Sequence, residues 1–171
     1  MDTQELVDAR TADKTWSQWI GLIFRLFLAG MWIYAGAIKI GNLEANLISV
    51  EAYQLPFPEW LIRLVGYAQP PLEIALGVLL LLGLFTRLSA IATSLGMLVF
   101  IAGISWAWAN GLRIDCGCFS AGGELTALEE PTYLLDIVRD TVFLLMAVFL
   151  IWRPGTPFAV DNWLFSSAVS D

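Results

Sequence analysis

Four long apolar segments dominate this chain and limit the folds it can adopt. They cover about residues 19–38, 60–84, 88–109 and 133–152. Each approaches the roughly 20 residues that an α-helix needs to cross a bilayer. Residues 74–84 have no polar stripe that could face water, which argues against an all-α soluble protein. The sequence therefore predicts an all-α membrane protein with a four-transmembrane-helix bundle.

Composition and the ends of the segments support a membrane location. Only 15% of the residues are charged, whereas about a quarter are charged in an average soluble domain. Aromatic residues lie at the segment ends, as in the interfacial belt of membrane proteins. We expect a polar N-terminal segment at 1–16, a transmembrane domain at 17–153 and a tail at 154–171. The acidic start does not resemble a signal peptide, so the first span is expected to be retained.

The distribution of basic residues predicts the orientation. The basic residues on the side of both termini are Arg10, Lys14, Arg87 and Arg153. Lys39 and Arg113 fall on the other side, so the positive-inside rule favours cytoplasmic termini. Residues 40–59 and 110–131 then face outward. Within the first of these loops, the apolar spacing of residues 42–53 predicts a short helix on the membrane surface.

Cys116 and Cys118 are the only cysteines, and the chain has no histidine. The lack of histidine excludes Ser-His and Cys-His nucleophile pairs and any histidine ligand for zinc or haem. Redox chemistry of sulfur is the remaining candidate, in an outward loop where disulfides persist. Gly117 has no Cβ and allows the bend that a small disulfide ring needs. Such strained disulfides tend to be oxidising and labile.

Three other interpretations of the cysteine pair stay open. The pair can be a structural staple, although closing so short a loop gains little entropy. It can be two inert thiols, or half of a metal site shared between subunits. No metal site is predicted within one chain.

Two ionisable residues, Arg25 and Glu73, fall inside predicted spans, where charge is expensive and needs a partner. Each lies about 10 Å from the cytoplasmic edge, judged from the helical rise per residue. Their matching depth predicts a buried ion pair between the first two spans.

A second polar cluster is expected beneath the cysteine loop. The fourth segment contributes Arg139 and Asp140, with Asp136 one turn earlier. Arg139 and Tyr67 share an estimated depth of about 10 Å below the outer surface. Together with Lys39 and Arg113, such a cluster can stabilise a thiolate or a quinone oxygen. Alternatively, the two aspartates simply neutralise Arg139 along one helix.

Several motifs resemble the DoxX-like superfamily and, within it, the MauE branch of methylamine-utilisation membrane proteins. The most specific is the Cys-Gly-Cys-Phe run that begins at Cys116, which is followed here by Ser120 where the family usually has Gly. The other matching features are Arg25, Gly30 with Ala35-Gly-Ala-Ile-Lys39, Tyr53-Gln-Leu-Pro56, Pro71-Leu-Glu73-Ile-Ala-Leu-Gly77, Leu82-Gly-Leu-Phe-Thr-Arg87, Gly111-Leu-Arg113 and Leu135-Asp-Ile-Val-Arg-Asp140.

The resemblance implies a bacterial inner-membrane protein that supports extracytoplasmic thiol–disulfide exchange. Its cysteine pair would act as a thiol-disulfide oxidoreductase with a thioredoxin-like partner and relay electrons to a quinone. The chain has one cysteine pair, whereas full oxidases of the vitamin K epoxide reductase type use two.

The main alternative is a non-catalytic accessory subunit of a respiratory or other membrane complex. A small-solute transporter is a weaker alternative, because no inverted repeat is apparent. Membrane lipid is expected around the helices. The net charge of −7 argues against a nucleic-acid partner.

Overall fold

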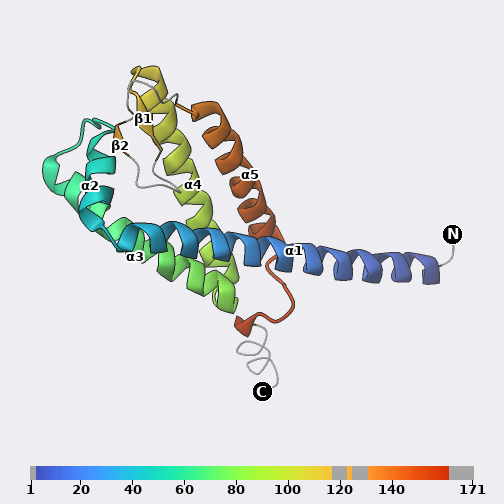
Figure 1. Cartoon of the computed structure of the whole chain (residues 1–171). Helices are drawn as coiled ribbons and strands as arrows, with labels where there is room; N and C mark the ends of the chain where they lie inside the picture. Colours follow the sequence, from blue (N-terminus) through green and yellow to red (C-terminus); the bar gives the residue numbers. More distant parts are fainter. Residues whose placement is uncertain (1–2, 117–122, 125–130, 162–171) are drawn as a thin grey trace.

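The chain forms helices over most of its length (Figure 1). The computed structural model describes residues 3–116, 123–124 and 131–161, with side chains described from residue 16 onward except at 123–124. The helices in these ranges are α1 (Thr3–Ile40), α2 (Leu43–Glu51), α3 (Glu59–Leu82), α4 (Thr86–Ala109) and α5 (Tyr133–Trp152). Two short strands, β1 (Ile114–Asp115) and β2 (Gly123–Glu124), pair antiparallel.

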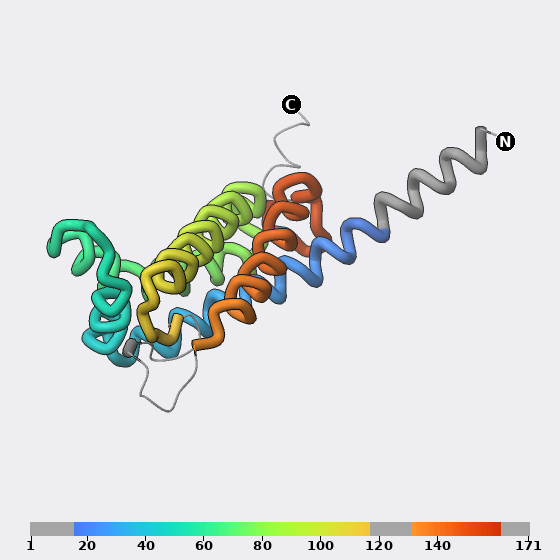
Figure 2. Tube along the Cα trace, turned by 90° about the horizontal axis from the view of Figure 1, so that it is seen from above, coloured from blue at the N-terminus to red at the C-terminus, as the bar shows by residue number. Residues whose placement is uncertain are grey.

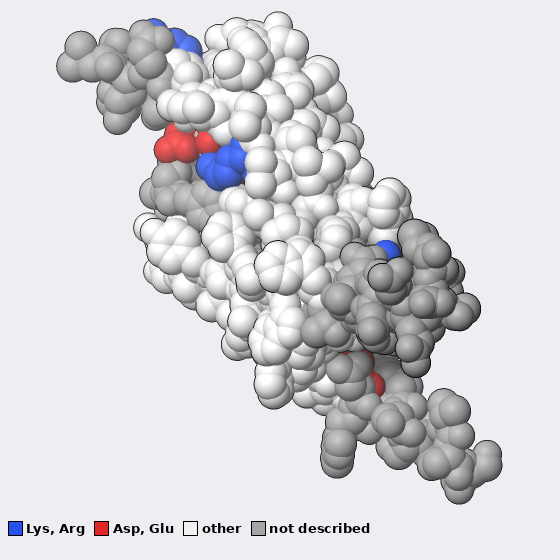
Figure 3. All heavy atoms as spheres, turned by 90° about the vertical axis from the view of Figure 1, so that its right-hand side faces the viewer, with Lys and Arg blue, Asp and Glu red and all other residues white. Residues whose placement is uncertain are grey.

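Three helices in the described part of the chain are long and apolar enough to cross a membrane. They are Trp16–Ile40 within α1, the whole of α3 and the whole of α4. α5 has a suitable length of 20 residues but carries Asp136, Arg139 and Asp140 near its start. Figure 3 shows a broad area of one face without acidic or basic side chains, as contact with lipid requires. The predicted membrane class is confirmed at the level of these three helices.

Helix α1 lies alongside α3, and α4 lies alongside α5 (Figures 1 and 2). The first pair approaches closely at two glycines, one from each helix. A Cβ atom on Gly36 would lie 2.8 Å from the carbonyl oxygen of Pro70, and one on Gly77 would lie 2.9 Å from that of Ala29. Glycine is thus required at both positions for the backbones to meet. α3 continues as one helix through Pro70 and Pro71.

The main core lies where α1, α3, α4 and α5 meet. Leu28 and Trp32 from α1 pack there with Met97 from α4 and Phe143 from α5, and all four are buried. The indole nitrogen of Trp32 donates a hydrogen bond of 3.1 Å to the hydroxyl of Thr93, which satisfies its polar group inside the core. Aromatic and aliphatic side chains from three helices therefore fix how the two helix pairs sit against each other.

One end of the molecule holds α2 and the two strands, beside the C-terminal end of α1 (Figure 1). The side chain of Asn42 accepts a hydrogen bond of 3.1 Å from the backbone nitrogen of Ala45 and so caps α2. The helix predicted for residues 42–53 is confirmed. Asn46 anchors it by donating a hydrogen bond of 2.7 Å to the carbonyl oxygen of Gly66 in α3.

The other end holds the turn between α3 and α4 and the segment after α5. Gly83 has a φ of 66° and caps the end of α3. The helix therefore ends at Leu82, two residues before residue 84, the predicted end of the second segment. The carboxylate of Asp161 accepts hydrogen bonds of 2.7 Å from the backbone nitrogen of Phe85 and 2.8 Å from that of Thr86. A residue distant in sequence therefore satisfies the first donors of α4.

Candidate functional site

The loop that carries Cys116 is held by a small apolar cluster. Ile114 of β1 and Tyr133 of α5 are buried in it, and Cys116 packs against its edge. The hydroxyl of Tyr133 donates to the carbonyl oxygen of Leu112 and accepts a hydrogen bond of 3.1 Å from the backbone nitrogen of Ile114. These contacts fix the backbone just before Cys116 to the start of α5.

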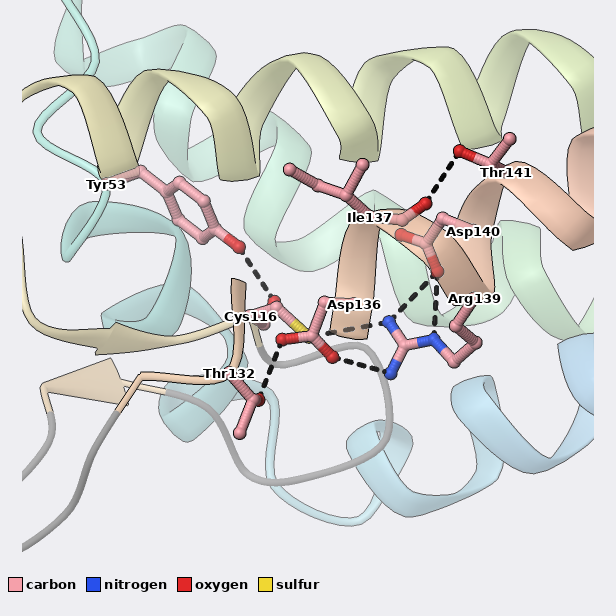
Figure 4. A network of polar contacts seen from close by, with 8 residues as sticks. All are labelled: Tyr53, Cys116, Thr132, Asp136, Ile137, Arg139, Asp140 and Thr141. Atoms are coloured by element: carbon pink, nitrogen blue, oxygen red, sulfur yellow. Dashed lines mark hydrogen bonds and ion pairs between the residues drawn. The ribbon is translucent and has the colours of Figure 1, made fainter. Parts of the chain in front are cut away.

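Tyr53 holds the backbone of Cys116 from the opposite side. This residue follows α2, and its hydroxyl donates a hydrogen bond of 2.8 Å to the carbonyl oxygen of Cys116 (Figure 4). The cysteine is therefore clamped between the α2 region and α5, which leaves its side chain in a defined position.

Arg139 is the side chain that reaches the sulfur. Its Nη2 donates to Sγ of Cys116 at 3.6 Å (Figure 4). Nη1 donates to Oδ1 of Asp136 and Nε to Oδ1 of Asp140, both at 2.9 Å. Thr132 in turn donates a hydrogen bond of 3.0 Å to the second oxygen of Asp136. The guanidinium is thus oriented by two carboxylates, with one of its donors directed at the thiol.

The net charge of Arg139 and its two aspartates determines how they act on the sulfur. Arg139 contributes one positive charge, and Asp136 and Asp140 contribute two negative charges. The sulfur therefore gains a directed hydrogen bond rather than a net positive field. The two aspartates form ion pairs with Arg139 and still leave its Nη2 in contact with Cys116.

The remaining residues expected near the sulfur lie elsewhere or cannot be placed with it. Cys118 lies outside the described residues, and so does any bond between the two sulfurs. Arg113 is exposed in the loop before β1. Tyr67 lies on the surface of α3, where its hydroxyl donates a hydrogen bond of 2.7 Å to a carboxylate oxygen of Glu44. Within the described residues, no group of three or more acidic or cysteine side chains could hold a metal ion.

Glu73 pairs with Lys39, so the predicted pair between Arg25 and Glu73 is wrong. The Lys39 Nζ donates to the two carboxylate oxygens at 2.7 and 3.0 Å. Arg25 instead donates a hydrogen bond of 2.6 Å to the hydroxyl of Thr156. Its guanidinium lies against Gly83, which follows Glu73 by ten residues, or about 15 Å of helix. Lys39 reaches the acid because its long apolar stem can run along the helix.

Sequence reasoning missed two contributors to the site. Tyr53 was recognised only as part of a family motif, and Tyr133 only as an aromatic residue at the end of a segment. Each acts through a contact with a loop distant in sequence. No spacing pattern could have signalled those contacts.

The family comparison bears on the whole helical region. A family model described as "Methylamine utilisation protein MauE" matches residues 17–153. The chain belongs to the MauE family. Its apolar helices and this membership identify a multi-pass membrane protein. No curated protein and no solved structure matches the chain. In this MauE-family protein, the Cys116–Arg139 contact lies inside the matched region.

Proposed function

We propose that this MauE-family protein supports methylamine utilisation by thiol–disulfide exchange with a thioredoxin-like protein outside the cytoplasm. The observation that carries the proposal is the 3.6 Å contact between Arg139 Nη2 and Cys116 Sγ. A thiolate is the species that leaves and attacks in exchange, and a hydrogen bond from a guanidinium stabilises it. Purely inert thiols have no need of an oriented cation.

The proposed reaction conserves electrons and protons. A thiolate of the partner attacks Sγ of Cys118 in the Cys116–Cys118 disulfide, and a bond forms between the two proteins. Cys116 leaves as a thiolate beside Arg139. The second thiolate of the partner then breaks the mixed disulfide, so the partner departs oxidised by two electrons and this protein is left as a dithiol. A lipid-soluble quinone is the proposed acceptor that restores the disulfide.

We further propose that α5 is a fourth span, that the protein lies in a bacterial inner membrane and that both termini are cytoplasmic. The supporting feature is the separation of the two ends of the molecule. β1, which directly precedes Cys116, lies with α2 at one end of the molecule, whereas the turn between α3 and α4 and the segment after α5 lie at the opposite end (Figure 1). A membrane-impermeant maleimide should label the reduced cysteines in intact spheroplasts. Labelling only after lysis would reverse the orientation.

Trapping of the partner tests the exchange reaction. In the reverse direction, the lone Cys118 thiolate of Cys116→Ser attacks the disulfide of the oxidised partner. The mixed disulfide should accumulate, because Cys116 is no longer there to resolve it. The adduct is separated on non-reducing gels and the captured protein is identified by mass spectrometry. Cys118→Ser should trap little, and the double serine variant should trap nothing.

Absence of any adduct, together with full function of both single variants, would support the accessory-subunit alternative. Co-purification of the untreated protein in mild detergent then identifies the complex to which it belongs.

A further inference from the structure

A large apolar groove lies between α3 and α4, outside the sulfur site. Its volume is about 710 Å³, within the range of about 300 to 1,000 Å³ that is usual for small-molecule sites. Leu72 and Val99 line it and are more than half exposed. Since both belong to membrane-spanning helices, the groove is open toward lipid. A molecule dissolved in the bilayer can therefore enter it from the side.

The lining of the groove is apolar except at Gln69 and Glu73. Glu73 is only 3% exposed and is held by Lys39. The Gln69 amide donates a hydrogen bond of 2.9 Å to a Glu73 carboxylate oxygen. The carboxylate is almost fully enclosed and still borders the groove, as charge inside a membrane requires a partner. Gln69 is only partly buried and is the more accessible of the two polar groups. The arrangement suits an apolar molecule with one hydrogen-bonding ring or head.

The groove lies near the sulfur site but does not open into it. Trp32 and Phe100, with ring centroids 6.0 Å apart, line the groove and also a second, very small cavity. Asp140 lines that second cavity, and its Oδ2 is buried without a hydrogen-bond partner. Asp140 also accepts from Arg139, whose Nη2 contacts Cys116. The rings of Trp32 and Phe100 therefore separate the groove from Asp140 and Arg139, which contact each other and, through Arg139, Cys116.

We propose that the α3–α4 groove binds the ring of a lipid-soluble quinone, which takes the electrons of the cysteine pair. This inference rests on the proposed function and names the site of its electron acceptor. Oxidation of two thiols to a disulfide releases two electrons and two protons, and conversion of the quinone to the quinol takes up the same number. Gln69 supplies polar contact to the ring, while the apolar walls hold the tail.

Photolabelling tests the site directly. The probe is a short-chain ubiquinone analogue with a photoreactive azido group, added to the purified protein in lipid nanodiscs. Labelled peptides should map to α3 and α4 around Gln69 and Ala92. Ala92→Phe fills the groove, which Ala92 lines, and should lower labelling by at least about tenfold, a loss equivalent to roughly 1.4 kcal/mol of binding.

Two further variants keep the test decisive. Ala102→Phe places the same ring at another exposed position of α4, outside the groove lining, and should leave labelling unchanged. Gln69→Leu removes the polar group while leaving the Lys39–Glu73 pair in place, and should weaken labelling. Uniform labelling of the lipid-facing helices, insensitive to Ala92→Phe, would assign the groove to lipid chains. Cross-links between copies would assign it to self-association. Either result overturns the quinone site.

The two proposals fail separately. Partner trapping by Cys116→Ser requires no quinone, so a trapped adduct without groove labelling rejects only the quinone site. Groove labelling without any adduct rejects the exchange reaction and leaves a quinone-binding protein.

Discussion

At the scale of single residues, the site depends on how Arg139 divides its donors. Two carboxylates fix its plane, and Nη2, which also lies 2.9 Å from Oδ1 of Asp140, reaches the sulfur of Cys116. Lysine cannot reproduce this fork, because an ammonium group is a point charge without a planar arrangement of donors. The sulfur contact should therefore be more sensitive to the shape of this cation than to its charge.

We expect Arg139→Lys to slow the reaction of Cys116 with a small maleimide by about tenfold, the effect of losing one hydrogen bond to a charged group. The rate is measured in a Cys118→Ser background, so that only one thiol reacts. Arg139→Gln should slow it at least as much, and thermal unfolding shows whether that variant still folds. Arg63→Gln is the control, since Arg63 pairs with Glu59 on the exposed surface of α3. Equal rates in all four proteins would remove the assigned role of Arg139.

At the residue level, the sequence could indicate a position where a single helix determines it. Arg139 and its aspartates lie near the start of α5, so the helical rise alone placed them beneath the cysteine loop. Predicting the partner of Glu73 required the limits of the first two spans and the reach of the lysine side chain. An error of a few residues at each limit was enough to select Arg25 in place of Lys39.

At the scale of elements, apolar runs predicted the helices well, because burial in lipid or in a core needs a continuous apolar surface. The strands were not predicted. Each has only two residues, and they exist because Ile114 pairs with Glu124 across the loop. The close contact of α1 and α3 depends on two glycines, of which Gly77 belongs to α3. Its counterpart Gly36 became visible only when the two helices were placed together.

Gly36→Ala should lower the thermal unfolding temperature, because its Cβ would lie 2.8 Å from the carbonyl oxygen of Pro70 and push α1 away from α3. The matched control is Gly30→Ala on the same helix, where a Cβ meets nothing within 4 Å. That change should leave stability equal or raise it by up to about 1 kcal/mol through helix propensity. If both variants melt at the same temperature, the glycine contact does not govern helix packing.

At the scale of the whole molecule, residues 154–161 connect elements that are far apart in the chain. Arg25 of α1 donates to Thr156 and to the carbonyl oxygen of Phe158, and Asp161 accepts from the start of α4. This segment follows the region that the family model matches. Stability of the helices is therefore expected to depend on a segment outside that region.

Asp161→Ala should destabilise the folded protein by about 1 to 2 kcal/mol, the usual effect of losing a helix cap. The measurement is unfolding in detergent, followed by circular dichroism. Glu51→Ala, which removes an exposed carboxylate at the opposite end of the molecule, serves as the control. A loss that is the same for both variants would mean that Asp161 acts only through overall charge.

The Asp161 cap also has a consequence for biosynthesis. Phe85 precedes α4 with a φ of 50° and its own side chain caps nothing, so the first donors of α4 wait for a carboxylate made 76 residues later. During synthesis, α4 therefore forms before this cap is in place, and the cap is added only after residue 161 has left the ribosome. Until then, water at the end of the molecule that holds the α3–α4 turn can satisfy those amide groups.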